Sequence, residues 1–324
     1  MPVGNSDRGV GLWAGQIMFG LNSVNDHINW WHEKLPGSNE NFDHEGTLTS
    51  TILIPNLTIG LTNYINVSFS QIVGYRQMGW NGPEASIHHR DEGSNSHFNN
   101  AIGGLFGDFK IMTRYLIIND GSGPGQRLFL GGGLSIPSKN TLTSDPFFLQ
   151  NKEESKSHRH FSISDGCYKA SGEIQYYKKR TRNPVFIGGS FLFEAPIIEN
   201  KYGYKAPKFY ELSLTGFTKD IKTIKASFGV SISLKHTENA YWNSLKAPNS
   251  KSTVFSIGVG SLKTFDFASV SLNIIKPYFL NNKSSLIGSE SGNIDQELRA
   301  LQVSLGFRKV FDFVIPWLDP TSNL

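Results

Sequence analysis

Residues 225–235, K-A-S-F-G-V-S-I-S-L-K, alternate apolar and polar side chains without a break. Successive side chains of a strand point to opposite faces, so this stretch predicts a strand with one apolar and one polar face. Two environments fit it: a soluble sandwich with its core on the apolar side, or a membrane barrel with lipid there and a polar lumen opposite. The apolar set is Ala226, Phe228, Val230, Ile232 and Leu234, and the polar set is Lys225, Ser227, Gly229, Ser231, Ser233 and Lys235.

Twelve segments have a strand pattern, and the connections between them alternate strictly between long and short. This places all short turns at one end of the sheet and all long loops at the other. Outer-membrane barrels have this asymmetry, with short periplasmic turns and long extracellular loops, whereas a soluble Greek-key sandwich has no reason for it. We therefore predict an all-β, antiparallel up-and-down transmembrane β-barrel of about twelve strands, with a soluble β protein as the alternative. The predicted strands are residues 12–21, 47–58, 65–76, 103–118, 127–136, 170–179, 185–194, 209–217, 223–235, 253–263, 268–279 and 298–311.

The composition fits a barrel better than a helical membrane protein. Hydrophobic residues make up 38% of the chain, and no window approaches the ~18 apolar residues that a spanning helix needs. A spanning strand needs only about 9–11 residues, half of which face a polar interior. No Pro- or Ser-rich linker divides the 324 residues, so we predict one barrel domain over 1–324, with strands over about 12–311 and a short tail at 312–324.

Three local details refine the predicted strands. Pro55 lies inside one strand, where a missing backbone donor predicts a bulge or bend. Gln71 and Ile72 break the alternation of the strand at 65–76. The polar segment 22–46, which contains Trp30-Trp31-His32, is predicted to be a long loop.

The charge distribution and the N-terminal residues indicate where the protein is located and which partners it binds. The net charge of +4 is spread along the chain with no dense basic block, so nucleic-acid binding is not predicted. The single cysteine, Cys167, cannot form an internal disulfide. The first residues lack a basic stretch followed by an apolar one, so we expect a mature or truncated form without its signal peptide, located in the bacterial outer membrane. The expected partners are the lipid bilayer and a small-molecule solute; the oligomeric state is not indicated.

Two Gly-rich segments carry a family resemblance. G-G-L-F-G-D-F-K-I-M-T-R-Y-L-I at 103–117 and L-F-L-G-G-G-L-S-I-P-S-K at 128–139 form a pair of strands that resembles outer-membrane proteins of the MetA-pathway-of-phenol-degradation, or "transporter", family. Further similarity lies in S-D-P-F-F-L-Q at 144–150, F-S-I-S-D-G at 161–166 and G-L-T-N-Y-I-N-V-S-F-S at 60–70. Here Ser138-Lys139 follow Pro137, where the family has Thr-Gly. The resemblance implies a channel-like barrel that passes small organic molecules, hydrophobic and aromatic ones among them.

Charged and amide side chains on the predicted inner faces are candidates to line the lumen. A charge facing lipid would cost ~2–4 kcal/mol at the bilayer midplane, so the phase of these residues argues for a polar interior. They can pair across the barrel as structural networks or orient a passing solute. The candidates are Asp108, Lys110, Arg114, Glu173, Gln175, Lys225, Lys235, Gln302 and Arg308.

Histidines gather in the two longest predicted loops, and imidazole is a common metal ligand. A copper, zinc or nickel site there could also use Asp91 and Glu92. No spacing matches a zinc motif, however, and polar loops commonly carry histidine, so no metal site is predicted. The weak candidates are His88, His89, His97, His158 and His160.

No motif indicates an enzyme or a cofactor. The chain has no G-x-S-x-G elbow, and Gly131-Gly132-Gly133 lacks the lysine and the following helix of a phosphate loop. We therefore predict a channel or transporter for small organic solutes, without catalysis or cofactor. The alternative is a non-transporting barrel whose long His- and Trp-containing loops bind a metal or a surface partner.

Overall fold

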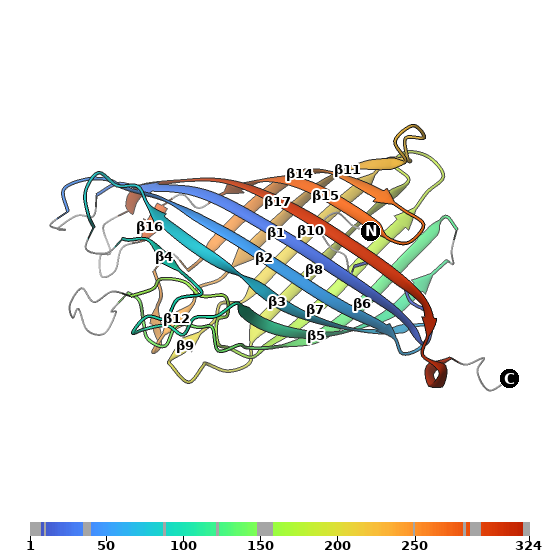
Figure 1. The fold of residues 1–324 in the computed structure, drawn as a ribbon, viewed down its shortest axis with the longest axis horizontal. Helices are drawn as coiled ribbons and strands as arrows, with labels where there is room; N and C mark the ends of the chain where they lie inside the picture. Colours follow the sequence, from blue (N-terminus) through green and yellow to red (C-terminus); the bar gives the residue numbers. More distant parts are fainter. Residues whose placement is uncertain are drawn as a thin grey trace.

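The computed structural model describes residues 8–9, 11–34, 40–86, 89–120, 123–147, 158–248, 250–280, 283–285 and 293–319. Twelve long antiparallel strands form a closed barrel (Figure 1), as the sequence predicts. No helix in these residues is long and apolar enough to cross a membrane. The strands are β1 (Gln16–His32), β2 (His44–Gly60), β3 (Ile65–Trp80), β5 (Phe106–Asn119), β6 (Gly125–Ile136), β7 (Lys169–Lys179), β8 (Phe186–Pro196), β10 (Phe209–Phe217), β11 (Ala226–Thr237), β14 (Ser252–Thr264), β15 (Ser269–Phe279) and β17 (Asn293–Val314).

The barrel closes where the first strand pairs with the last. β1 runs antiparallel to β17 from Met18 opposite Val310 to His32 opposite Gln296. Every other neighbouring pair of long strands is consecutive along the chain, so the topology is up-and-down. Closure removes the unpaired strand edges that would otherwise be exposed. The smaller elements are β4 (Glu92–Gly93), β9 (Tyr204–Lys205), β12 (Tyr241–Trp242), β13 (Leu245–Lys246), β16 (Lys283–Ser285) and the helical turn η1 (Pro316–Leu318).

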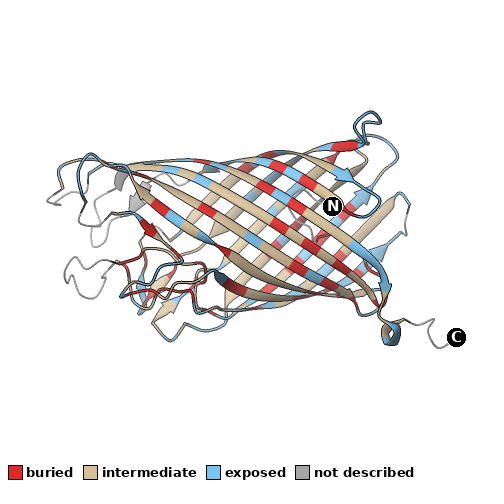
Figure 2. Ribbon diagram, in the orientation of Figure 1, coloured by how far each residue is buried: buried red, intermediate tan, exposed pale blue. Residues whose placement is uncertain are grey.

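The wall has an apolar outside and a polar inside. On β11, Phe228 and Val230 are 44% and 60% exposed, whereas Ser227 between the strand start and Phe228 is buried. Figure 2 shows this alternation of buried and exposed positions along the strands. Exposed leucine, isoleucine and valine on neighbouring strands give the apolar outer band that a lipid bilayer requires.

Three local predictions have different outcomes. The register of β3 against β5 shifts between Gln71 and Val73, which confirms the predicted break. Pro55 lies opposite Leu21 without a register shift, so no bulge forms there, but the pairing of β2 with β3 is interrupted at Ile54 and Pro55. Residues 22–32 continue β1 instead of forming a loop, because they pair on both sides with β2 and β17. Trp30 lies opposite Gly46, where a Cβ atom would come within 2.4 Å of the indole ring.

The long loops fold together at one end of the barrel. Ala101, Leu142, Ala240 and Trp242, from three different loops, form one buried apolar cluster, and Tyr204 from a fourth loop packs against it. The short strands β9, β12 and β13 form a separate three-stranded sheet in the same layer. The long-loop end is therefore a folded structure, while at the opposite end short turns connect the described strands.

Candidate functional site

The lumen contains a buried ion network centred on Glu173 of β7. One carboxylate oxygen lies 2.8 Å from Nε of Arg114, and the other lies 3.1 Å from Nε of Arg8. Arg114 also donates to the Ser68 hydroxyl at 3.1 Å. These groups are almost fully buried, and each guanidinium is held by a charge-assisted hydrogen bond. Two of the predicted lumen candidates, Arg114 and Glu173, are thus brought together, whereas Arg8 was not predicted.

Residues before β1 cross the lumen to the opposite wall. Arg8 donates to Ser190 on β8 at 2.8 Å, and the Gly9 backbone N–H donates to Gln175 on β7 at 2.9 Å. Arg308 on β17 donates to the Arg8 carbonyl at 3.5 Å. β8 is the seventh of twelve strands counted from β1, so these contacts span the barrel. We call Arg8, Gly9 and residues 11–15 the inner segment.

Residues 12–15 of the inner segment were predicted as the start of the first strand. β1 begins only at Gln16, and the Ala14 backbone N–H donates instead to Asn63 at 3.0 Å. Leu12 and Ala14 are buried. Gly9 and Gly11 fit the close packing here, since a Cβ at Gly11 would approach Leu116 to 3.2 Å. The sequence feature that could have revealed the inner segment is a single cationic residue, Arg8, among the glycines that precede the first strand.

A second group of charges lies nearer the long loops. Lys110 forms an ion pair with Glu194 on β8, and Ser171 donates to the same carboxylate at 3.1 Å. Lys169 forms an ion pair with Asp165, and its Nζ lies 3.9 Å from Asp108. Together with the network of Glu173, these pairs make the inner face of β5 to β8 a charged wall.

The other predicted lumen residues lie apart from these networks. Gln302 donates to Asp26 at 2.7 Å across the β1–β17 pair. Lys235 lies on the inner face of β11, opposite Glu211 of β10. Lys225 lies in the turn before β11, exposed and with φ of 50°, and so it stands outside the strand that was predicted to carry it.

The opposite half of the lumen is lined mainly by small side chains. Ser213 and Ser233 are paired across β10 and β11 and are partly exposed toward the interior. Gly258 lies opposite Ser231, and Gly260 lies opposite Gly229. We call the inner face of β10, β11, β14 and β15 the small-residue wall. Because its side chains are short, space in the lumen is expected along this wall.

A cavity of about 250 Å³ lies among the loops at the long-loop end. Its lining combines the aromatic side chains of Phe147, Tyr204 and Trp242 with the charged groups of Arg76 and Asp165. Arg76 also donates to the Ser162 carbonyl at 3.0 Å. Apolar walls with a few convergent polar groups are typical of small-molecule sites.

A buried arginine holds two of the long loops together. The guanidinium of Arg159 donates to the carbonyls of Ser94 and Ser96, both at 2.7 Å, and of Ile102 at 2.9 Å. Its backbone N–H donates to the Asn100 side chain at 2.8 Å. Burial lowers the pKa of Arg159 to about 10, which still leaves it charged at neutral pH. This contact set fixes the β3–β5 connection against the β6–β7 connection.

The structure also places the histidines. His158 and His160 lie with their Nε2 atoms 3.2 Å apart, and His160 Nδ1 is 3.0 Å from Glu92. His97 Nδ1 accepts from the Gly103 backbone at 3.3 Å, and Asp91 accepts from the Trp80 backbone at 2.9 Å. His88 lies outside the described residues.

His89 belongs to a group that the sequence did not reveal. It contacts His32, the last residue of β1, and His44, the first residue of β2. Burial lowers the pKa of His32 and of His44 below its ordinary value. Both were predicted to lie in a loop, and only the strand pairing brings them together.

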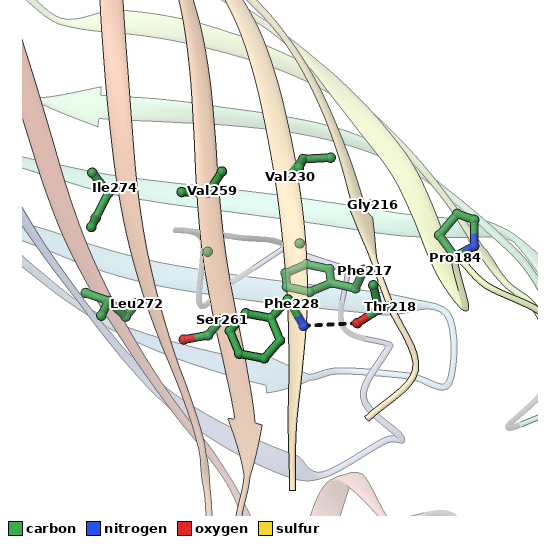
Figure 3. A pocket seen from close by; sticks show the side chains of 12 residues that line it. Pro184, Gly216, Phe217, Thr218, Phe228, Val230, Val259, Ser261, Leu272 and Ile274 are labelled. Carbon is green, nitrogen blue, oxygen red and sulfur yellow. Dashed lines mark hydrogen bonds between the residues drawn. The ribbon is translucent and has the colours of Figure 1, made fainter. Parts of the chain in front are cut away.

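An apolar hollow lies on the outer wall. It measures about 570 Å³ and is lined by apolar side chains of β11, β14 and β15, including Val230, Val259, Leu272 and Ile274 (Figure 3). These residues belong to the exposed apolar band, so the hollow opens toward lipid. It is therefore not a candidate for the path of a polar solute.

Comparison with known proteins supports the fold. No family model and no curated protein matches the chain. The structure is similar to the crystal structure of the COG4313 outer membrane channel from Pseudomonas putida F1, with a TM-score of 0.62, 12% identity, and coverage of 95% of this chain and 100% of that chain. It is also similar to a Pseudomonas aeruginosa FadL homologue, with a TM-score of 0.42, 9% identity, and coverage of 92% and 90%. The chain thus has the fold of an outer-membrane β-barrel.

Proposed function

We propose that this protein is an outer-membrane channel for small organic solutes and that the inner segment is its closure. The observation that carries the proposal is the way in which the inner segment is held. Arg8 and Gly9 cross a polar lumen, and their contacts to the far wall are hydrogen bonds and one ion pair. Water can replace such contacts when the segment leaves, whereas displacing a tightly packed apolar plug would expose apolar surface.

The loop cavity and the small-residue wall suit a solute of mixed polarity. The loop cavity offers aromatic surface from Phe147, Tyr204 and Trp242 together with the cation of Arg76. The small-residue wall then supplies hydroxyl groups with little side-chain bulk. A small aromatic or hydrophobic molecule with one polar or anionic group fits this lining, in keeping with the family resemblance.

The test is conductance in a planar lipid bilayer. Arg8→Ala removes the ion pair to Glu173 and the hydrogen bond to Ser190, so it is expected to raise the open probability severalfold while Arg114 still partners Glu173. Arg299→Ala is the matched control, because Arg299 is exposed and forms its ion pair with Glu297 on the same strand, far from the inner segment's contacts. Absence of conductance in both the wild type and Arg8→Ala would exclude a channel.

The second candidate is a barrel that presents its loops to a metal or a surface partner. The folded loop layer, fixed by Arg159 and by the apolar cluster around Trp242, favours it. A barrel that never conducts but keeps its loops protected from protease would support this function instead.

A further inference from the structure

The group of His32, His44 and His89 lies at the rim of the barrel, beyond the apolar band. Arg299 and Glu297 form an exposed ion pair on β17, opposite Asn29 and Trp31 of β1. Charged side chains at this level mark where the wall meets water. His32 continues β1 one residue further and pairs in register with His44 of β2.

The spacing of the three imidazoles suits one metal ion. One nitrogen from each ring can be chosen so that all three lie within 4.8 Å of one another. His32 Nε2 and His89 Nε2 are 3.4 Å apart. Two nitrogens that are each bound 2.0–2.1 Å from a tetrahedral zinc ion are about 3.3–3.4 Å apart, so His32 and His89 already have the separation that a shared ion requires.

Hydrogen bonding fixes how His32 presents its ring. Its Nδ1 lies 2.7 Å from the Glu33 carbonyl, which can only accept, so Nδ1 carries the proton. In the neutral ring, Nε2 then has a free lone pair, and this atom faces His89. Metal-binding histidines commonly use one nitrogen for the metal and donate from the other to a carbonyl or carboxylate.

A carboxylate lies beside the ring of His44. Glu40 Oε2 lies 3.0 Å from His44 Nε2. The Ser86 hydroxyl donates to the same oxygen at 3.1 Å and accepts from the His89 backbone N–H at 2.9 Å. Ser86 thereby positions Glu40 and His89 relative to each other.

Burying the polar ring nitrogens of this group is energetically unfavourable unless a ligand binds them. His44 is fully buried, and its Nδ1 has no hydrogen-bond partner within the described residues. The ring of Trp80 stacks on His89 at 5.4 Å and meets His44 edge-on at 5.4 Å. Buried polar atoms without hydrogen bonds are unfavourable, and a metal ion would satisfy the nitrogen that faces it.

We propose that His32, His44, His89 and Glu40 bind a divalent transition-metal ion of the zinc type. Three imidazoles and one carboxylate form a ligand set suited to Zn²⁺, and to Cu²⁺ or Ni²⁺, but not to the oxygen-preferring Ca²⁺. The ion would join the segment after β3 to the ends of β1 and β2, and so brace one loop against the rim.

The test is zinc retention by the full-length barrel in detergent. After EDTA treatment and equilibrium dialysis against ZnCl₂, the folded wild type is expected to retain about one zinc per chain and no Ca²⁺ in a parallel dialysis. His44→Ala and His89→Ala are each expected to weaken zinc binding by at least about tenfold. His27→Ala is the matched control, because His27 is an exposed residue of the same strand.

His89→Ala is expected to fold even if His44→Ala does not, because His89 lies outside the long strands. The proposal can therefore be tested on His89→Ala alone. A wild type without retained zinc would overturn the site. So would His89→Ala binding zinc as tightly as the wild type. A double variant of His158 and His160 should retain zinc; loss confined to that variant would move the metal to the neighbouring pair and overturn the proposed ligands.

Discussion

The two halves of the lumen differ in the length and charge of the side chains that line them. On the charged wall, Glu173 holds two arginines, and Lys110 pairs with Glu194. On the small-residue wall, serines and glycines face the interior, and Ser213 and Ser233 keep partial exposure. Long charged side chains link strands across the lumen, whereas short ones extend less far into it. One wall therefore anchors the inner segment, and the other is the path expected for a solute if the proposed channel opens.

The largest expected effect is on the charged wall. Glu173→Ala leaves Arg8 and Arg114 buried without their shared carboxylate, which is expected to cost about 3–5 kcal/mol. The measurement is urea unfolding in lipid vesicles. Glu211→Ala on β10 is the control and should change stability by less than about 0.5 kcal/mol. Equal losses in the two variants would mean that the walls do not differ.

Adjacent residues of β11 test the two faces of the small-residue wall. Val230→Arg puts a charge against lipid and is expected to cost ~2–4 kcal/mol, since Val230 is 60% exposed on the outer band. Ser231→Arg puts the same charge into the lumen, where it should leave stability nearly unchanged but reduce conductance. Unfolding and conductance are measured on both variants. Similar stabilities would contradict the assigned faces.

The smallest expected change in the free energy of unfolding is that of variants at two lysines that face the lumen. Lys110→Met leaves Glu194 with a weaker set of partners and is expected to cost about 1–2 kcal/mol. Lys235→Met on the small-residue wall should cost less than about 0.5 kcal/mol. Lys235→Met should instead change the ratio of anion to cation permeability, measured as a reversal potential across a salt gradient. Selectivity that responds only to Lys110→Met would place the path along the charged wall.

The strand patterns predict much of the barrel wall. The side-chain period of two assigns Phe228, Val230 and Ile232 to one face before any neighbour is known, and the structure places them outward. Counting the segments with a strand pattern predicts twelve strands, which the barrel has. The inward positions of Asp108, Lys110 and Arg114 follow from the same period. These features are local, because each depends on a strand and its own turns.

The candidate sites depend on contacts between distant residues. Arg8 and Glu173 meet across the lumen, 165 positions apart in the sequence, and no local pattern encodes their distance. His32 and His44 look like loop residues until β1 and β2 pair, and His89 joins them only when a third segment folds over the rim. The sequence by itself determined which face of each strand is apolar, because side-chain direction is a property of the strand. Only the closed barrel decided which polar groups meet, because closure brings residues from opposite walls and separate loops within a few ångströms of one another.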